Sequence, residues 1–389
     1  MNRLLNSALS VFPILFSVLL LNPIIPGENT TPKKISSKAV PKIQAAILLD
    51  VSNSMDGLIE QAKAQLWNMV SVMGKATCNG VAPQIEIALY EYGRSTNNVA
   101  DGYVKQISPF TADLDKLSQD LFKLTTNGGD EYCGQVIFTS LNELKWDTNS
   151  QNYKVIFIAG NEDFLQGNLL YTKACNEANQ KGVIVNTIYC GDRMQGIKEH
   201  WNLAGECGNG SFTNINQHAK VPDIPTPYDT TLIVLNEKLN DTYLYYGAEG
   251  ADKHSLQSRM DAGNAGISSQ AAAQRTSVKG NKQLYNNASW DLVDALDNDK
   301  EFINKVDLKT LPDSLQTKSR AELKKIVETK NAERGNVQKE IATISVEREK
   351  YIATERARAA SGNNNIATLE TEVEKVIRGQ AKRFNMIIQ

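Results

Sequence analysis

The chain of 389 residues lacks the short motifs that identify the common hydrolases and nucleotide-binding enzymes. It contains no G-x-S-x-G, H-E-x-x-H or G-x-x-x-x-G-K-[ST] segment. It has only 3 histidines, His200, His218 and His254, and none shares a local motif with a cysteine or a carboxylate at catalytic spacing. These absences argue against the familiar enzyme classes, and we expect that the protein is not an enzyme.

An excess of positive charge is also missing. The 42 lysine and arginine residues are balanced by 44 aspartate and glutamate residues, which gives a net charge of −2 at pH 7. Because nucleic-acid binding depends on a basic surface that neutralises phosphates, we expect no nucleic-acid partner. Hydrophobic residues at 41% and charged residues at 22% are typical of a globular chain. The length suffices for one large domain with an accessory region, or for two modest domains.

Closely spaced cysteine pairs are absent as well. The sequence contains no C-x-x-C pair, which argues against a structural zinc site. In an exported protein disulfides are allowed, and an odd number of cysteines leaves at least one thiol unpaired. The cysteines are Cys78, Cys133, Cys175, Cys190 and Cys207.

The first 26 residues differ in character from the rest of the chain. Arg3 precedes a largely apolar stretch over residues 4–21, a pattern typical of a secretion signal. We therefore expect residues 1–26 to be a signal peptide or an N-terminal anchor, although Pro13 argues against an ideal spanning helix. Both alternatives predict a protein that is exported, either periplasmic or anchored with its bulk facing the periplasm. Residues 27–42 are polar and are expected to form a linker.

Residues 43–219 alternate short apolar segments with segments of helical spacing. Residues 153–159 (YKVIFIA) are apolar on both faces, whereas residues 84–92 (QIEIALYEY) alternate polar and apolar side chains. Strands of this kind that alternate with helices predict an α/β fold with a doubly wound, mainly parallel sheet between two layers of helices. The six expected strands cover residues 43–49, 84–92, 104–107, 153–159, 183–189 and 211–215.

The remainder of the chain is expected to be helical. Residues 220–315 begin with a proline-rich segment and are predicted to form a helical and irregular extension. Ser319 and Glu322 fit a capping box that begins a long charged helix, and Thr368 begins a second helix with an apolar stripe. The short polar turn between these helices predicts that residues 316–389 form an antiparallel, coiled-coil-like helical hairpin, which packs on the domain or forms oligomers.

The strongest local motif is ILLDVSNSM, residues 47–55. An apolar strand ends at Asp50, and Ser52 and Ser54 follow before a helix begins. At the carboxyl end of a parallel strand, one carboxylate and two hydroxyls at alternate positions suit a small hard cation, which prefers oxygen ligands. The alternative is that these side chains only cap the helix.

This segment resembles the metal-ion-dependent adhesion site (MIDAS) of the von Willebrand factor A (VWA) domain family, which begins with D-x-S-x-S. The resemblance covers residues 43–219 and includes NGGDEYCG at 127–134 and KVIFIAGNED at 154–163, which are similar to segments of exported bacterial proteins with this domain. It implies a Rossmann-like VWA fold, a bound Mg²⁺ (or Mn²⁺ or Ca²⁺) and an unknown protein partner. It therefore predicts a metal-dependent protein-binding or adhesion module of the bacterial cell envelope.

Two positions depart from the family pattern. Asp130 stands where the family normally has a threonine, and Gly160 stands where it normally has an aspartate. If Asp130 coordinates the ion directly, Asp50 and Asp130 together neutralise a divalent charge, and the attraction for a carboxylate of the partner becomes weaker. The predicted metal-site residues are Asp50, Ser52, Ser54 and Asp130, with Glu162 and Asp163 as carboxylates behind the direct ligands.

The expected topology also suggests a disulfide. Cys133 begins a helix beside the proposed site and Cys190 ends a strand, so both are expected at the carboxyl edge of the sheet. We take a Cys133–Cys190 bond as a hypothesis, with buried free thiols as the alternative.

Two other functions stay open at this point. A metal-free structural scaffold would use the fold and the C-terminal helices alone. A hydrolase that activates water with a bound metal would need a base, for which Glu131, Glu162 and Asp163 are the available carboxylates.

Overall fold

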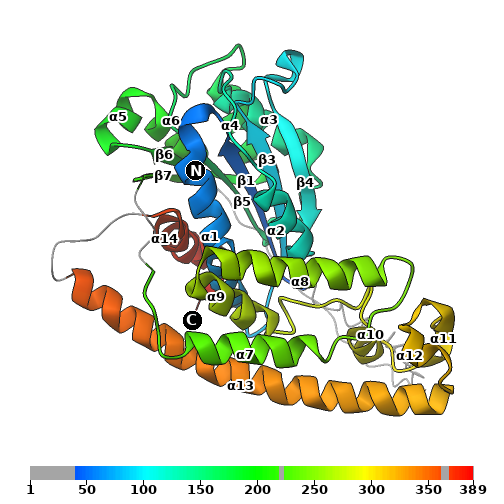
Figure 1. The fold of residues 1–389 in the computed structure, drawn as a ribbon. Helices are drawn as coiled ribbons and strands as arrows, with labels where there is room; N and C mark the ends of the chain where they lie inside the picture. The colour runs from blue at the N-terminus through cyan, green and yellow to red at the C-terminus, as the bar shows by residue number, and fades with distance from the viewer. Residues whose placement is uncertain (1–39, 219–222, 361–367, 389) are drawn as a thin grey trace, which may run out of the picture. The chain divides into compact units, whose positions relative to one another are not determined.

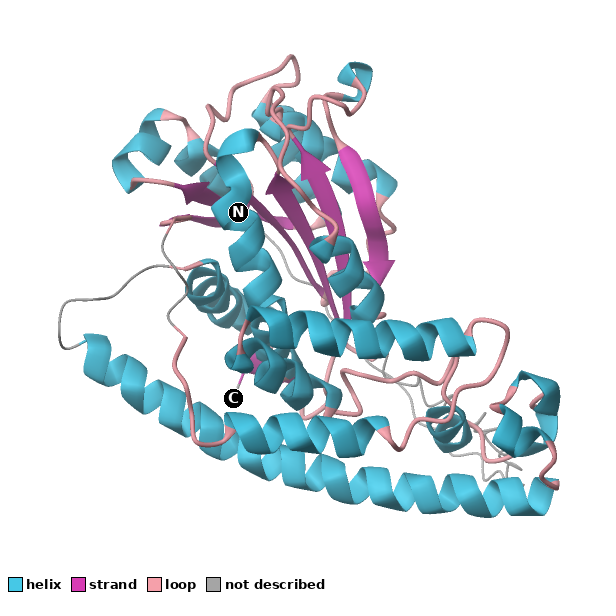
Figure 2. Ribbon diagram, viewed as in Figure 1, coloured by secondary structure: helices cyan, strands magenta, loops and turns pink. Residues whose placement is uncertain are grey.

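A central sheet organises the part of the chain that the computed structural model describes, residues 40–218, 223–360 and 368–388. Its six strands have the order β4-β3-β1-β5-β6-β7 (Figures 1 and 2). Neighbouring strands run parallel except β3 and β4, which are antiparallel. The doubly wound, mainly parallel sheet predicted from the sequence is thereby confirmed. The strands are β1 (Lys42–Asp50), β3 (Gln84–Tyr92), β4 (Lys105–Thr111), β5 (Tyr153–Gly160), β6 (Ile184–Cys190) and β7 (Asn209–Ile215).

Each face of the sheet has its own apolar core and its own layer of helices. In β1, Ala45 and Leu49 belong to one core and Ala46 and Leu48 to the other, as the alternation of side chains along a strand requires. The first face is covered by α1 (Asp56–Gly74) and α2 (Leu114–Phe122), and the second by α3 (Cys133–Glu143), α4 (Tyr171–Lys181) and α6 (Trp201–Cys207).

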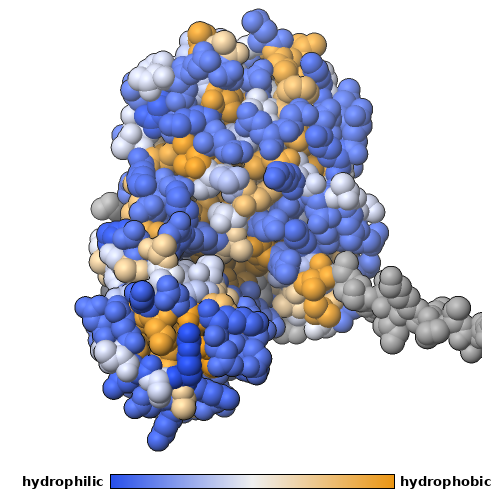
Figure 3. Space-filling view, turned by 90° about the vertical axis from the view of Figure 1, so that its right-hand side faces the viewer, coloured by the Kyte–Doolittle hydropathy of each residue, from blue (hydrophilic) through white to orange (hydrophobic). Residues whose placement is uncertain are grey.

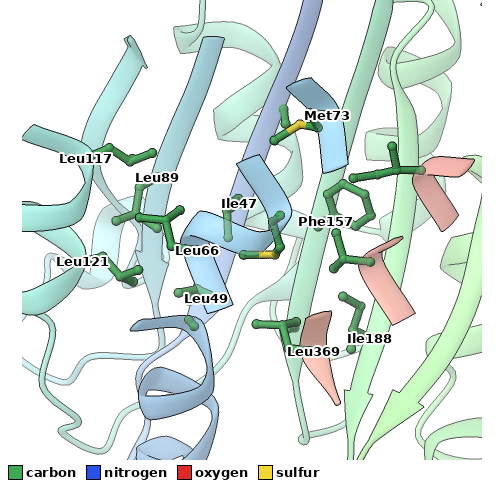
Figure 4. A pocket seen from close by; sticks show the side chains of 16 residues that line it. Ile47, Leu49, Leu66, Met73, Leu89, Leu117, Leu121, Phe157, Ile188 and Leu369 are labelled. Carbon is green, nitrogen blue, oxygen red and sulfur yellow. The ribbon is translucent and has the colours of Figure 1, made fainter. Parts of the chain in front are cut away.

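A small cavity lies within the core of the first face (Figure 4). Its volume is about 30 Å³, and its apolar lining includes Leu66, Phe157 and Leu369. A space of this size holds about one water-sized sphere, and an apolar lining offers a water molecule no hydrogen bond. We therefore regard it as a packing gap and not as a ligand site.

After β7 the chain forms a helical region that packs against the sheet-covering helices. Helix α9 contacts α1, α8 contacts α2, and α13 runs along α7 (Figure 1). On the face shown in Figure 3, hydrophilic residues surround small separate groups of apolar ones. The helices of this region are α7 (Asp229–Asn240), α8 (Gly250–Ile267), α9 (Ser269–Lys279), α10 (Leu292–Asn298), α11 (Phe302–Lys305), α12 (Asp313–Gln316) and α13 (Arg320–Ala360).

The last helix, α14 (Leu369–Ala381), returns to the sheet instead of pairing with α13. It packs against α1 and β7, and the strand that follows it, β8 (Met386–Ile388), pairs antiparallel with β2 (Ala76–Cys78). The apolar stripe of α14 is thus buried in the first core, where Val373 and Ile377 are members. The two helices therefore pack against different partners and do not form the antiparallel hairpin expected from the sequence. Helix α14 belongs to the α/β layer although it lies outside residues 43–219 in the sequence.

Buried ion pairs connect the helical region internally and to the α/β layer. Three arginines, in α9 and α13, are almost fully buried, and each contacts one or two carboxylates. Since a buried charge is tolerated only when it is paired, these contacts restrict the positions of the helices relative to one another. The pairs are Arg275 with Asp115 and Asp261, Arg334 with Asp291 and Asp294, and Arg348 with Asp229.

One disulfide is present, and it differs from the bond suggested by the sequence. Cys175 of α4 is bonded to Cys207 at the end of α6, with their Cα atoms 5.8 Å apart. Cys133 and Cys190 are buried free thiols, so the hypothesis of a Cys133–Cys190 bond was wrong. The reason is that Cys133 packs in the core of the second face and Cys190 in the core of the first face, with the sheet between them.

The N-terminal predictions concern residues that the structure does not describe. Residues 1–26, the expected signal peptide or anchor, and nearly all of the linker at 27–42 lie outside the described residues. Among the helices in the described ranges, none is long and apolar enough to cross a membrane.

Candidate functional site

Three neighbouring strands end together at the carboxyl edge of the sheet. Asp50 is the last residue of β1 and lies opposite Tyr92, the last residue of β3. On the other side, Leu49 lies opposite Ala159, so Gly160 at the end of β5 is next to Asp50. Parallel strands that end side by side produce the crevice in which open α/β sheets bind their ligands.

The side chains of the D-x-S-x-S motif gather in this crevice. Asp50 is fully buried, and its Oδ1 accepts a 2.7 Å hydrogen bond from the backbone N–H of Ser52. The hydroxyls of Ser52 and Ser54 are 3.2 Å apart, and that of Ser54 donates to Oδ1 of Asn161 at 3.3 Å. No side chain of the described residues caps the start of α1 or of the short turn before it, Asn53–Met55. Asp50, Ser52 and Ser54 therefore do not act as caps of the helix, which was the alternative interpretation of the motif.

The other oxygen of Asp50, Oδ2, is buried and has no hydrogen-bond partner among the described residues. Two glycines keep the space around the carboxylate open. A Cβ on Gly160 would lie 3.0 Å from Oδ2 and 2.5 Å from the hydroxyl of Tyr92, and a Cβ on Gly93 would lie 3.0 Å from Oδ1. With glycine at position 160, no side chain of that residue fills the space beside Oδ2.

The loop of residues 127–134 is hydrogen-bonded to the D-x-S-x-S loop that follows β1. The N–H of Gly128 donates to Oδ1 of Asn53 at 2.9 Å, and the N–H of Asn127 donates to the carbonyl of Val51 at 2.8 Å. Gly129 has no room for a side chain, because a Cβ there would lie 2.7 Å from the backbone of Gly93. The two glycines therefore allow this loop to pack against the neighbouring backbone and side chains.

Glu131, and not Asp130, is the residue of this loop that faces Asp50. Glu131 is buried, and its Cγ and Oε1 lie 3.0 and 3.7 Å from the place where a Cβ on Gly93 would stand, beside Oδ1 of Asp50. Asp130 is exposed, and its Oδ2 accepts a hydrogen bond from the hydroxyl of Tyr132 at 3.3 Å. Sequence reasoning considered Glu131 only as a hydrolytic base, because the motif position alone does not tell which of two adjacent carboxylates points inward.

The two carboxylates after β5 have separate environments. Glu162 is exposed, and its backbone carbonyl accepts a 2.7 Å hydrogen bond from the indole of Trp201. Asp163 turns away from the crevice, since its Oδ1 lies 3.0 Å from Nδ1 of His200 and also accepts from the N–H of Leu165. Asn161, which the sequence analysis did not single out, accepts a hydrogen bond at its Oδ1 from the hydroxyl of Ser54.

Burial makes the carboxyl groups of the crevice harder to ionise. Burial raises the pKa of Asp50 to about 7, with the charge of Glu162 adding to the rise and hydrogen bonds from Ser52 opposing it. Burial also raises the pKa of Glu131 to about 8, and the charges of Asp50 and Glu162 add to that rise. In both residues burial is the largest cause, because a carboxylate that is removed from water is harder to ionise, and neighbouring carboxylates add to the effect.

The residues that are present fit a hard divalent cation. They offer two carboxylates and two hydroxyls, from Asp50, Glu131, Ser52 and Ser54. One carboxylate oxygen, Oδ2 of Asp50, has no hydrogen-bond partner in the described part of the chain. Oxygen-only sets of this kind suit Mg²⁺, Mn²⁺ or Ca²⁺ and not softer metals. Within the described ranges no group of three or more His, Cys, Asp or Glu side chains is arranged to hold a metal, so any cation here depends on the serine hydroxyls as well.

Comparison with solved structures finds likenesses that cover under half of this chain. An aerotolerance-related membrane protein from Bacteroides fragilis is similar at 15% identity over 45% of this chain and 92% of its own, with a TM-score of 0.33. A von Willebrand factor type A structure from Catenulispora acidiphila is similar at 13% identity over 45% of this chain and 39% of its own, with a TM-score of 0.34. Proximal thread matrix protein 1 from the mussel byssus, with a zinc-occupied MIDAS motif, is similar at 13% identity over 45% of this chain and 42% of its own, with a TM-score of 0.34.

These similarities are distant, and in the last two the match spans less than half of the other chain. No protein-family model and no curated protein matches the sequence. The assignment of the fold therefore rests on the molecule itself. The order and direction of the six strands, with the D-x-S-x-S loop at the carboxyl end of β1, define a von Willebrand factor A-like α/β fold.

Proposed function

We propose that this chain is a divalent-cation-dependent protein-binding module of the bacterial cell envelope. The observation that carries the proposal is the environment of Asp50. Its carboxylate is buried, its Oδ2 has no partner among the described residues, and Ser52, Ser54 and Glu131 lie around it. A buried anionic oxygen without a partner is costly, and a bound cation would remove that cost.

Asp50, Ser52, Ser54 and Glu131 are the residues that would hold the cation. When bound, Mg²⁺ or Mn²⁺ would neutralise the carboxylates and offer an open coordination position to an oxygen atom of the partner protein. The serine hydroxyls already lie close together, so the loop needs little rearrangement for this role. Asp50 and Glu131 together would balance the charge of a divalent cation. The cation would then attract a carboxylate of the partner protein less strongly, as the sequence analysis expected, with Glu131 in the place of Asp130.

Two observations support an exported location. The N-terminal sequence has the pattern of a secretion signal, with Arg3 before the apolar residues 4–21. The Cys175–Cys207 disulfide is of the kind that persists in oxidising compartments such as the periplasm. An envelope protein that binds a partner at the carboxyl edge of its sheet is the function that these features support best.

A crosslinking pull-down from native envelopes tests this function. The bait is the full chain, used with Mg²⁺ or with a chelator, as wild type, Asp50→Ala and Asp163→Ala. We expect a partner that is recovered with Mg²⁺, is lost with the chelator and with Asp50→Ala, and is retained with Asp163→Ala. The Asp163 variant is the matched control, because it removes one carboxylate of the same region that faces His200 and not Asp50. Equal recovery in all samples would instead indicate a metal-free scaffold.

A further inference from the structure

Three connections meet at the carboxyl edge of the sheet, beside the Asp50 crevice. They are residues 93–104 between β3 and β4, residues 125–132 leading into α3, and residues 161–170 between β5 and α4. The first and the third rise above the ends of the strands at the top of the view in Figure 1. Loops that a rigid sheet holds in place are the usual carriers of recognition, so the outer surface of these connections is where a partner would meet the molecule.

The ring of Tyr132 touches both the first and the third connection. A Cβ on Gly102 would lie 3.2 Å from Cδ2 of this ring, and a Cβ on Gly167 would lie 2.7 Å from its Cγ. The ring of Tyr103 meets that of Tyr132 edge to face, with the ring centroids 5.7 Å apart. Since Tyr132 directly follows Glu131, which faces the crevice, this aromatic pair adjoins the proposed cation site.

Large apolar side chains of the same connections are exposed to solvent. Val99 is 62% exposed, Leu165 46% and Leu170 72%, and Tyr103 and Tyr132 are partly exposed. We call these five residues the rim. A single exposed apolar residue is ordinary, but several of them that gather with tyrosines around a crevice are typical of a protein-binding surface.

The charges of the three connections are mostly negative. Asp101, Asp130 and Glu162 are exposed carboxylates, and the one basic residue of these connections is Arg94. The charge of Arg94 is already matched, because its Nε and Nη2 donate to the two carboxylate oxygens of Glu91 at 2.9 and 3.1 Å. The connections therefore favour a positively charged partner over an acidic one, and they also disfavour docking on an anionic lipid surface.

We propose that the rim binds a segment of a partner protein that is rich in both apolar side chains and lysine or arginine. The apolar side chains would cover the rim, and the basic ones would face the exposed carboxylates around it. This inference rests on the proposed function and gives the partner its chemistry. Because Asp50 and Glu131 already balance a divalent charge, the oxygen that the segment offers to the cation is a neutral one, such as a backbone carbonyl.

Fluorescence anisotropy of four labelled peptides of equal length, titrated with the full-length protein in Mg²⁺, tests the proposal. The first peptide is composed of leucine and lysine, the second of leucine and glutamate, the third of serine and lysine, and the fourth of leucine and serine. We expect the leucine–lysine peptide to bind at least about tenfold more tightly than each of the others, because it alone supplies both apolar contacts and positive charge. Added salt should weaken its binding.

Two variants locate the binding on the rim. Leu170→Ser removes an exposed apolar side chain, and Asp101→Asn removes an exposed carboxylate. Each should weaken the leucine–lysine peptide roughly threefold or more without lowering Tm. Val234→Ser and Glu237→Gln, at exposed positions of α7, are the matched controls and should bind the peptide as wild type does.

The proposal is overturned if any of the other three peptides binds as tightly as the leucine–lysine peptide, or if Leu170→Ser and Asp101→Asn both bind it as wild type does. It is also overturned if ultracentrifugation shows a wild-type dimer that Leu170→Ser dissolves, because a second copy of the chain would then cover the rim.

Mn²⁺ titration of the same samples separates this inference from the proposed function. Leu170→Ser and Asp101→Asn should bind Mn²⁺ as wild type does, since neither side chain belongs to the proposed cation site. Selective binding of the leucine–lysine peptide by a wild type that takes up no Mn²⁺ would support the rim and contradict the cation site. Normal Mn²⁺ binding without peptide selectivity would overturn the rim alone.

Discussion

The α/β layer and the helical region both have apolar cores, but among the described residues the fully buried arginine and lysine side chains lie in the helical region. In the α/β layer, β5 and β6 are buried along their whole length, and two large apolar clusters cover the faces of the sheet. In the helical region, the largest fully buried side chains include Arg275, Arg348 and Lys279, each with a carboxylate or amide partner. Apolar burial is non-directional and tolerates small shifts, whereas a buried ion pair fails when either partner is lost.

This difference shows how a long charged helix can be part of a folded core. Helix α13 has little apolar surface, but its Arg334 contacts Asp291 at 2.6 Å and Asp294 at 2.7 Å, and its guanidinium lies over the ring of Tyr243. The remaining donors of Arg334 bind the hydroxyl and the carbonyl of Thr242. The helix is therefore positioned by specific polar contacts in addition to its few buried apolar side chains, such as Leu323, Val327 and Ile341.

The largest expected effect is the loss of one buried arginine. Arg334→Met leaves Asp291 and Asp294 buried without their counter-charge, which should lower the free energy of unfolding by about 3–5 kcal/mol. Urea denaturation followed by circular dichroism measures this. The control is Lys350→Met on the same helix, which removes an exposed i,i+3 pair with Glu347 and should cost less than about 0.5 kcal/mol. Equal costs for both variants would contradict the distinction between the two regions.

A smaller effect is expected from truncating the apolar face of α14. Ile377 is 1% exposed within the core of the first sheet face, so Ile377→Ala should lower the free energy of unfolding by about 2–4 kcal/mol. Lys375→Ala, on the exposed side of the same helix, is the matched control and should have little effect. A negligible cost for Ile377→Ala would mean that α14 is not part of the α/β core.

The pH dependence of stability separates the regions further. Burial disfavours the charged form of Asp261, but Arg275 and Lys279 outweigh burial and hold its pKa below the ordinary value of 3.8. Because the pKa is lower in the folded state, the stabilisation is complete above pH 3.8 and is lost as the pH falls below it. Tm should therefore fall more steeply on acidification in wild type than in Asp261→Asn. The exposed variant Asp241→Asn should keep the wild-type slope, and parallel slopes for all three proteins would contradict the prediction.

The sheet was predictable from the sequence because its pattern is local. The largely apolar run of β5 and the alternation in β3 each identify a strand without knowledge of its neighbours. The order of motif and strand likewise placed Asp50, Ser52 and Ser54 at the carboxyl edge, where the structure has them. The positions of these residues follow from chain direction alone.

The remaining features depend on tertiary packing. Contacts of residues 127–134 with Asn53 and Gly93 determine that Glu131 points inward and Asp130 does not. The sequence pattern contains no information about these contacts. The sequence placed Cys133 and Cys190 at one edge of the sheet but did not reveal that they lie on opposite faces. The apolar stripe of α14 could be predicted from the sequence, but the element against which it packs could not. The helix nearest in sequence, α13, is not the one that covers this stripe.

Calorimetric titration of the full chain with Mn²⁺ tests the role of the Asp50 crevice most directly. Wild type and Asp163→Ala should bind one ion with similar affinity. Asp50→Ala should show no saturable heat, and Glu131→Gln should bind at least about tenfold more weakly, because each removes a charge that faces the crevice. Saturable heats of the same size for wild type and Asp50→Ala would contradict a cation site at the end of β1.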